Sequence, residues 1–316
     1  MDKTSNKTTE SKLDELWKDV KEFRTSEHFL KVLEACKRFR NLAPYNSMLV
    51  EMQRPGARYV LTKQEWKKKF DRAIKPNARP IIVLVPFGPV DFLFDICDTY
   101  PTDLFKRTDE DILEELAAPF KTKREVSDEM LNNLTSQLAF HGIAIDNKFI
   151  SGAGYGARIE LLSDDYHPNI YIKINQRETL RRQANYLISA NKNALNGERY
   201  ANICHELGHL FCFHLPSPLN WKKWEERNIS LNAKEFEAES VAWIVCERLG
   251  IDKPSIQYLN GYLDKNKEIP PYVSIERILS AAKDVLNMCE VNKTITYRDG
   301  LLYKNCEEFK NAVKKL

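Results

Sequence analysis

The chain has 316 residues, of which 43% are hydrophobic and 29% charged, and its formal net charge is +3. This composition is typical of a folded globular protein and excludes collagen-like, low-complexity and globally disordered chains. At roughly 150 residues per domain the length predicts two domains, and the near balance of 48 basic and 45 acidic residues does not identify a partner by itself.

The cysteines and the N-terminal sequence indicate where the protein works. The seven cysteines are an odd number and widely scattered, which is typical of reduced thiols rather than of a disulfide framework. Residues 1–12 are polar, and no later run approaches 18 apolar residues. We therefore expect a cytoplasmic protein with a disordered N-terminus at 1–12 and no membrane partner.

Helical periodicity dominates the first part of the chain. Apolar residues recur at intervals of three and four between residues 13 and 42, which predicts two helices. Further helices are expected over residues 45–53 and 63–70. The apolar runs 81–85 and 90–97 flank a Phe-Gly-Pro turn and predict a β-hairpin, whereas residues 99–122 resemble an acidic loop that precedes a domain boundary.

The second part of the chain is expected to be mainly helical with a small sheet. Two strands, at 157–162 and 169–174, are joined by a polar turn. Helical spacing predicts helices at 127–141, 177–189, 198–214, 234–249 and 274–289.

The predicted fold class is therefore α+β. An N-terminal α/β domain with a β-hairpin is expected over residues 13–122. A mainly helical domain with a small edge sheet follows at 123–290, and a C-terminal hairpin and helix at 291–316.

Residues 205–209 read His-Glu-Leu-Gly-His, a metal-binding motif when helical. His205 and His209 are four residues apart and share a helix face, so both imidazoles can bind one zinc ion. Glu206 is adjacent and can act as a general base on an attacking water. The alternative is a chance match, in which buried histidines and a glutamate only hydrogen-bond one another. Gly208 is unfavourable inside a helix, and a close approach of another backbone would explain it.

The third metal ligand is expected on another helix. Residues 234–249 contain Glu235, Glu237 and Glu239 beside an apolar run, and periodicity alone does not choose between Glu237 and Glu239. His214 lies well off the ligand face if the helix continues, so we interpret it as a surface or core histidine. Cys212 lies near the metal face but is interpreted as a small core residue.

Residues 170–250 resemble zinc metallopeptidases of the ImmA/IrrE type. The resemblance rests on an edge strand at 170–175, the motif at 205–209 and residues 237–242, which match a Glu-Ala-x-x-x-Ala pattern. It implies a zincin-like domain in which Glu237 is the third zinc ligand and Glu239 supports the ligands or replaces it. Glu239 stands where that family usually has Asp or Asn, so the choice between the two glutamates remains open.

The N-terminal region is similar to the amino-terminal domain of ArdC-type antirestriction proteins. The matching residues are Tyr45-Asn46-Ser47-Met48-Leu49, Gln53-Arg54-Pro55-x-Ala57, Trp66, Lys75-Pro76 and Phe94-Asp95. This resemblance implies binding of single-stranded DNA. ArdC-like chains also join such a domain to a metallopeptidase-like one.

The charge distribution of the same region independently favours DNA binding. Between Lys31 and Ile82 there are 13 basic and four acidic residues, an excess of nine positive charges that can follow a phosphate backbone. The candidate contacts are Arg54, Arg58, Trp66, Lys67, Lys68, Lys69, Arg72 and Lys75. The alternative is a structural one, with Trp66 in a helix core and the lysine run as a solvated face.

Two functions remain as hypotheses. The first is a zinc metalloendopeptidase that cleaves a protein or peptide substrate and also binds single-stranded DNA. The second is an antirestriction or regulatory DNA-binding protein whose metal site is mainly structural. Glu206 favours the first, because a structural zinc usually has four protein ligands and needs no base. The sequence sets neither the oligomeric state nor the peptide substrate.

Overall fold

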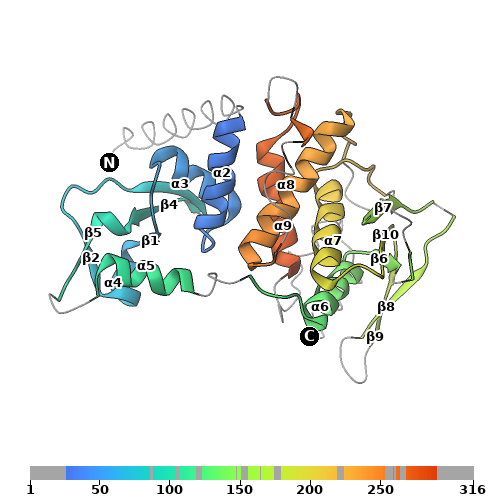
Figure 1. Cartoon of the computed structure of the whole chain (residues 1–316), viewed down its shortest axis with the longest axis horizontal. Helices are drawn as coiled ribbons and strands as arrows, with labels where there is room; N and C mark the ends of the chain where they lie inside the picture. The colour runs from blue at the N-terminus through green and yellow to red at the C-terminus, as the bar shows by residue number, and fades with distance from the viewer. Residues whose placement is uncertain are drawn as a thin grey trace.

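A computed structural model shows a mixed α+β fold, in agreement with the predicted class (Figure 1). The structure describes residues 26–85, 88–103, 107–118, 123–146, 148–150, 156–163, 165–173, 179–218, 224–252, 259, 261–263 and 268–289. The expected disordered N-terminus, the first predicted helix and the expected C-terminal hairpin lie outside these residues. None of the helices in the described part of the chain combines the length and hydrophobicity needed to cross a bilayer.

In the part of the N-terminal region that the structure describes, there are helices, short strands and a 3₁₀ turn. Its elements are α2 (Ser26–Arg38), α3 (Pro44–Gln53), β1 (Val60–Thr62), α4 (Lys63–Phe70), β2 (Arg72–Ile74), β3 (Ile81–Val85), β4 (Gly88–Asp95), η1 (Ile96–Asp98), β5 (Thr99–Pro101) and α5 (Asp109–Ala117). Strand β4 is central in an antiparallel sheet of order β1-β4-β3, and β2 pairs with β5. The predicted hairpin is confirmed, with Ile81 of β3 opposite Leu93 of β4.

Helix α5 lies where an acidic loop was expected. The Thr108 hydroxyl accepts a hydrogen bond from the backbone N–H of Asp111, whose carboxylate accepts one from the backbone N–H of Thr108. This reciprocal pair is a capping box that starts a helix. Acidic side chains in a first helical turn also complement the helix dipole. The loop prediction was wrong because these acidic residues are the N-terminal signal of a helix.

Among its described residues, the second region contains three long helices, a shorter helix and two small sheets. Its elements are α6 (Asp128–Phe140), β6 (Ile143–Asp146), β7 (Ala157–Leu161), β8 (Asn169–Lys173), β9 (Thr179–Gln183), β10 (Tyr186–Ala190), α7 (Asn196–Phe211), α8 (Leu231–Leu249) and α9 (Ile275–Cys289). One sheet has the order β6-β10-β7, and the other consists of β8 and β9.

One prediction about these elements was wrong. The helix expected at 177–189 is replaced by β9 and β10, because β10 is the central strand between parallel β6 and antiparallel β7. The strands expected at 157–162 and 169–174 are confirmed as β7 and β8, but they pair with other strands, β7 with β10 and β8 with β9. Strand pairing between distant segments therefore overrode the local helical pattern.

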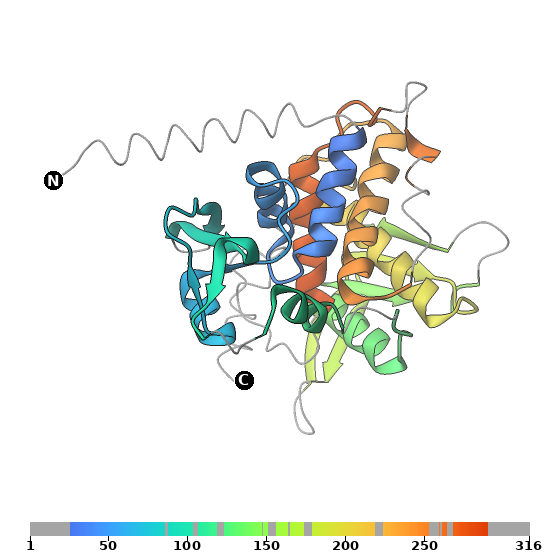
Figure 2. The same ribbon diagram turned by 60° about the vertical axis from the view of Figure 1, so that its left-hand side comes forward.

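The largest core joins both regions. Phe29 and Leu33 of α2 and Met48 of α3 belong to the same buried cluster as residues of α6, α7, α8 and α9. In Figures 1 and 2, α2 lies beside α8. The expected domain at 13–122 thus shares part of its core with residues 123–290, and experiments on its function need the full chain.

Arg248, near the C-terminus of α8, links this helix to the N-terminal region. Its guanidinium donates to the carbonyl oxygens of Cys36 (2.8 Å), Phe39 (3.1 Å) and Leu42 (2.6 Å) and to the Ser47 hydroxyl (2.8 Å). The carbonyls at the end of a helix carry partial negative charge, which stabilises a buried cation. Helix α8 is therefore held at one end by α2 and α3, while its other end contributes to the site described next.

Candidate metal centre

Helices α7 and α8 approach closely at Gly208. A Cβ atom on Gly208 would lie 2.8 Å from the Cα of Ala238 and 2.9 Å from its carbonyl oxygen, so no side chain fits there. This confirms the expectation that another backbone approaches this glycine. The contact places the histidines of α7 opposite the glutamates of α8.

Three side chains direct their ligand atoms at one another, and we call His205, His209 and Glu235 the ligand group. The Nε2 atoms of His205 and His209 are 3.1 Å apart. The Glu235 carboxylate lies 3.2 Å from Nε2 of His205 and 3.4 Å from Nε2 of His209. In a tetrahedral zinc site with bonds of about 2.0–2.1 Å, neighbouring ligand atoms are roughly 3.3 Å apart. The ligand group therefore fits zinc in both spacing and chemistry.

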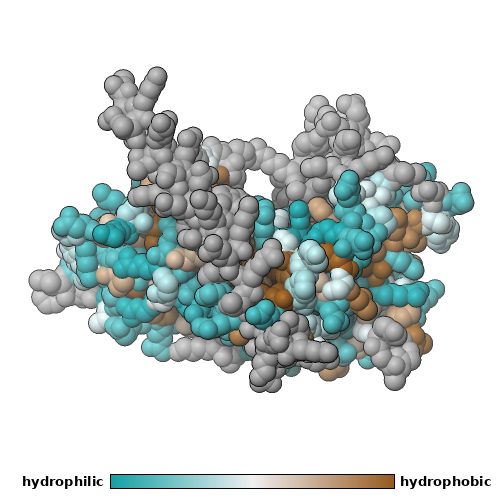
Figure 3. Space-filling view, turned by 90° about the horizontal axis from the view of Figure 1, so that it is seen from above, coloured by the Kyte–Doolittle hydropathy of each residue, from teal (hydrophilic) through white to brown (hydrophobic). Residues whose placement is uncertain are grey.

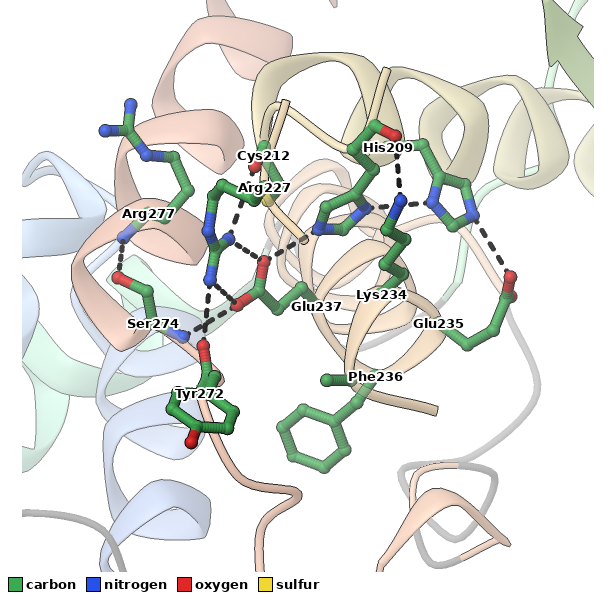
Figure 4. A network of polar contacts seen from close by, with 12 residues as sticks. His209, Cys212, Arg227, Lys234, Glu235, Phe236, Glu237, Tyr272, Ser274 and Arg277 are labelled. Atoms are coloured by element: carbon green, nitrogen blue, oxygen red, sulfur yellow. Dashed lines mark hydrogen bonds and ion pairs between the residues drawn. The ribbon is translucent and has the colours of Figure 1, made fainter. Parts of the chain in front are cut away.

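Glu237, the third ligand implied by the family resemblance, is not in the ligand group. It is fully buried, and its carboxylate accepts hydrogen bonds from His214 Nε2 (2.9 Å), Arg227 Nη2 (2.9 Å) and the backbone N–H of Ser274 (2.7 Å) (Figure 4). Residues two apart on a helix lie about 200° apart. Glu235 faces the histidine pair and Glu237 faces away from it, so the geometry replaces Glu237 by Glu235 as the candidate third ligand.

Glu239 occupies the supporting position that the resemblance left open. Its carboxylate lies 3.0 Å from Nδ1 of His205, on the side of the ring opposite the ligand group. Such a contact fixes the orientation and the tautomer of a metal-binding histidine. Burial by itself would lower the pKa of His205, but hydrogen bonds to Glu235 and Glu239 outweigh it and raise this pKa to about 9.

His209 has a similar contact through His214. The Nδ1 atoms of these two histidines are 2.9 Å apart, and Nε2 of His214 reaches Glu237. Burial lowers the pKa of His214. Burial would raise the pKa of Glu237, but hydrogen bonds from His214 and Arg227 lower it. His214 is therefore a core histidine, as one interpretation held, but it also contacts a candidate ligand.

A helix-ending turn places His214 beside His209. Helix α7 ends at Phe211, and Phe213 adopts a left-handed conformation with φ 63°. The backbone N–H of Phe213 donates to Leu210 (3.0 Å), and that of His214 donates to His209 (2.9 Å). These two bonds form a Schellman motif. His214 was expected to lie off the ligand face if the helix continued, but α7 ends before this residue.

The side chain of Glu206, the expected general base, lies between α7 and a neighbouring strand. Its side chain is buried, and its carboxylate accepts a hydrogen bond from the backbone N–H of Ile159 in β7. Burial raises the pKa of Glu206, while His205 and His209 oppose the shift. A carboxyl group with a raised pKa beside a metal site suits proton transfer.

The strand beside α7 is β7, whereas the family resemblance implied an edge strand at 170–175. Strand β7 is at the edge of the sheet β6-β10-β7 and packs on α7. Strand β8 covers the expected segment as far as Lys173, residues 174 and 175 lie outside the described part of the chain, and β8 pairs with β9 in a separate sheet. The strand that contacts Glu206 is thus one that sequence analysis predicted but did not connect with the site.

The structure removes two candidate DNA contacts from the surface. Trp66 is fully buried and donates through Nε1 to the carbonyl of Phe94 (2.8 Å). Arg72 is 2% exposed, donates to the Thr99 hydroxyl (2.6 Å) and pairs with Asp109 (2.5 Å). Trp66 is a core residue, as the structural alternative held, and neither side chain can contact a nucleic acid in this conformation.

The other candidate DNA contacts remain at least partly accessible. These are Arg54, Arg58, Lys67, Lys68, Lys69 and Lys75. Arg54 forms a two-bond pair with Asp98, at 2.6 and 2.8 Å, and Lys69 pairs with Glu65 at 3.1 Å. The left half of Figure 3, which holds this region, is mostly hydrophilic.

Comparisons with known proteins returned no match. A scan against protein-family models matched no family, and searches of curated proteins and of solved structures found no similar protein or structure. The function is therefore proposed from the geometry of the candidate metal centre.

Proposed function

We propose that this chain is a zinc-dependent metalloendopeptidase in which His205, His209 and Glu235 bind Zn²⁺. The observation that carries the proposal is the convergence of three side chains beside the separate carboxylate of Glu206. The two imidazole Nε2 atoms are 3.1 Å apart, and one oxygen of Glu235 lies 3.2 Å from Nε2 of His205 while the other lies 3.4 Å from Nε2 of His209. Three protein ligands leave one tetrahedral position open, which is typical of catalytic rather than structural zinc. The geometry thus favours the hydrolase over a protein with a purely structural metal.

The reaction assigns distinct tasks to the side chains of the site. When bound, zinc supplies Lewis acidity, which polarises the scissile carbonyl and makes the attacking water more acidic. A carboxylate oxygen of Glu206 accepts the proton of that water and delivers it to the nitrogen of the leaving amine. Burial raises the pKa of Glu206, which suits a group that both accepts and releases this proton. Glu239 orients His205 throughout.

We propose in addition that single-stranded DNA binds the N-terminal region at its exposed lysines. Lys67 and Lys69 of α4 keep side-chain exposures of 62% and 51%, and Lys68 between them is also exposed. This proposal rests on charge and on accessibility. It does not involve Trp66 or Arg72, which are buried.

Metal removal from the purified full-length protein tests the proposed enzyme. We expect about one zinc per chain and cleavage of an unfolded protein substrate. A chelator should abolish cleavage, and zinc, but not magnesium, should restore it, because magnesium prefers oxygen ligands. As a control, His167→Ala alters a histidine whose Nδ1 contacts the carbonyl of Ala184, and this variant should retain zinc and cleavage. Cleavage that is unaffected by zinc removal would refute the enzymatic proposal.

A further inference from the structure

A second group of ligand-type side chains lies behind the first. Cys212, His214 and Glu237, which we call the buried group, are all buried and have ligand atoms close enough to hold a metal ion. The 2.9 Å contact between Nδ1 of His209 and Nδ1 of His214 joins this group to the ligand group. The buried group could therefore hold a second metal or support the first.

The contacts of Glu237 argue against a second metal. One carboxylate oxygen accepts from Arg227 Nη2 and the backbone N–H of Ser274, and the other from Arg227 Nη1 and His214 Nε2. An arginine side chain stays charged at every pH that proteins tolerate. Arg227 thus already supplies the positive charge that balances Glu237, and a metal would have to displace it.

The thiol of Cys212 also disfavours a second metal. A cysteine binds a metal as the thiolate. Burial raises the pKa of Cys212 well above its usual range, and Glu237 adds to this effect. Binding of a metal at this thiol would therefore cost the additional free energy of removing its proton.

The hydrogen bonds of His214 instead indicate that it supports His209. If Nε2 of His209 offers its lone pair to a metal, the ring proton lies on Nδ1 and is donated to Nδ1 of His214. The proton of His214 then lies on Nε2 and is donated to Glu237. We infer that His214 is a positioning residue that fixes the orientation and tautomer of His209, and that the buried group binds no metal of its own. This inference rests on the proposed zinc site.

The backbone turn supports this role. A left-handed conformation is unfavourable for an aromatic residue and persists only where its surroundings hold it. The Phe213 ring stacks on Trp224, with centroids 5.2 Å apart, and the Arg277 guanidinium lies 4.2 Å from the Phe213 centroid. These contacts hold the turn that brings His214 to His209.

Zinc affinity of the full-length chain tests the inference. We expect His214→Leu to weaken zinc binding about 10–100-fold, the range for loss of a residue that supports a metal ligand. His214→Gln should recover part of the affinity, because its amide can accept from His209 and donate to Glu237. Cys212→Ser is the matched control and should keep wild-type affinity. Competition with a chromophoric chelator measures all four proteins, and circular dichroism checks their folding.

Each outcome separates the inference from the proposed function. A wild-type chain without zinc refutes the proposed function, and the inference falls with it. A wild-type chain that binds zinc, together with a folded His214→Leu variant of equal affinity, refutes the positioning role alone. Two zinc ions per wild-type chain, reduced to one by Cys212→Ser, would make the buried group a second metal site.

Nitrogen NMR of the zinc-loaded wild-type chain tests the tautomers without any variant. We expect protons on Nδ1 of His209 and on Nε2 of His214, with neither ring doubly protonated. A proton on Nδ1 of His214 would overturn the inference, because this atom could then not accept from His209. This measurement remains decisive if His214→Leu does not fold.

Discussion

The N-terminal basic region and the candidate metal centre differ in how their charges are balanced. In the former, Arg54 pairs with Asp98 and Arg72 with Asp109, so cations meet anions within the chain. In the latter, two imidazoles and a carboxylate converge, and all are groups that bind a cation. Internally balanced charges need no partner from outside the chain, whereas converging ligand atoms require a proton or a metal ion. Charge content alone is therefore a weaker guide to function than charge compensation.

The largest effect is expected from removing a ligand. His205→Ala, His209→Ala and Glu235→Gln should each lower the zinc content of the dialysed protein from about one per chain to near zero, since each removes one of three protein ligands. Elemental analysis of the purified variants measures this. If Glu235→Gln keeps its zinc and Glu237→Gln loses it, Glu237 is the ligand after all.

Glu206→Gln should separate chemistry from metal binding. The amide keeps the shape of the side chain but cannot accept a proton, so turnover should fall roughly 10²- to 10⁴-fold. The zinc content should not change, because Glu206 is not in the ligand group. Peptide cleavage and elemental analysis of the same preparation check both parts. Wild-type turnover would remove Glu206 from the mechanism.

Arg248→Met extends the comparison to a buried cation whose charge is balanced by backbone carbonyl dipoles and not by a carboxylate. The change leaves several buried acceptors in α2 and the following turn without their donor, and we expect the free energy of unfolding to fall by on the order of 3 kcal/mol. Urea denaturation of the full chain measures it. The exposed Lys63→Met is the control and should change stability by less than about 0.5 kcal/mol. Equal effects of the two substitutions would contradict the anchoring role.

Zinc itself should stabilise the folded chain. At a free concentration about 100-fold above Kd, a ligand that binds only the native state adds about 2.7 kcal/mol. The melting temperature should therefore rise with zinc in the wild type and not in His209→Ala. An equal rise in both proteins would place zinc binding outside the ligand group.

The smallest effect is expected in the basic region. If Lys67, Lys68 and Lys69 contact single-stranded DNA, changing all three to Gln should reduce the slope of log affinity against log salt by about 0.7 per lost phosphate contact. Fluorescence anisotropy at several salt concentrations measures this slope in the full chain. A matched change of the exposed Lys148, Lys192 and Lys283 is the control. An equal change of slope in both variants would show that the lysine run is only solvated surface.

Features that depend on neighbouring residues could be predicted from the sequence. The helix with His205 and His209 follows from helical spacing, and the β3–β4 hairpin follows from two apolar runs around a turn. Gly208 was also interpreted correctly, because a glycine inside a helix needs a reason beyond the helix itself. In each case the signal lies within about 16 residues of chain.

Features that depend on distant partners could not be predicted from the sequence. The strands at 179–183 and 186–190 exist because β10 is paired on both sides and β9 pairs with β8. The choice of Glu235 over Glu237 depends on the rotation of α8 about its axis, which the Gly208–Ala238 contact constrains. Ala238 is the residue of α8 that contacts Gly208 of α7, and Glu235, three residues before it, and Glu239, one residue after it, lie on nearly the same side of the helix. An alignment of α8 on Ala238 would therefore have predicted that these two glutamates face the site together.

His214 shows the same limit most clearly. Its distance from His209 along the chain predicts a side chain off the ligand face as long as the helix continues. The helix instead ends in a turn at Phe213, where a left-handed backbone conformation is held by Trp224 and Arg277. Local periodicity therefore predicts which residues share a helix, while the contacts between helices and turns determine which side chains meet, because those contacts join residues that are far apart in the chain.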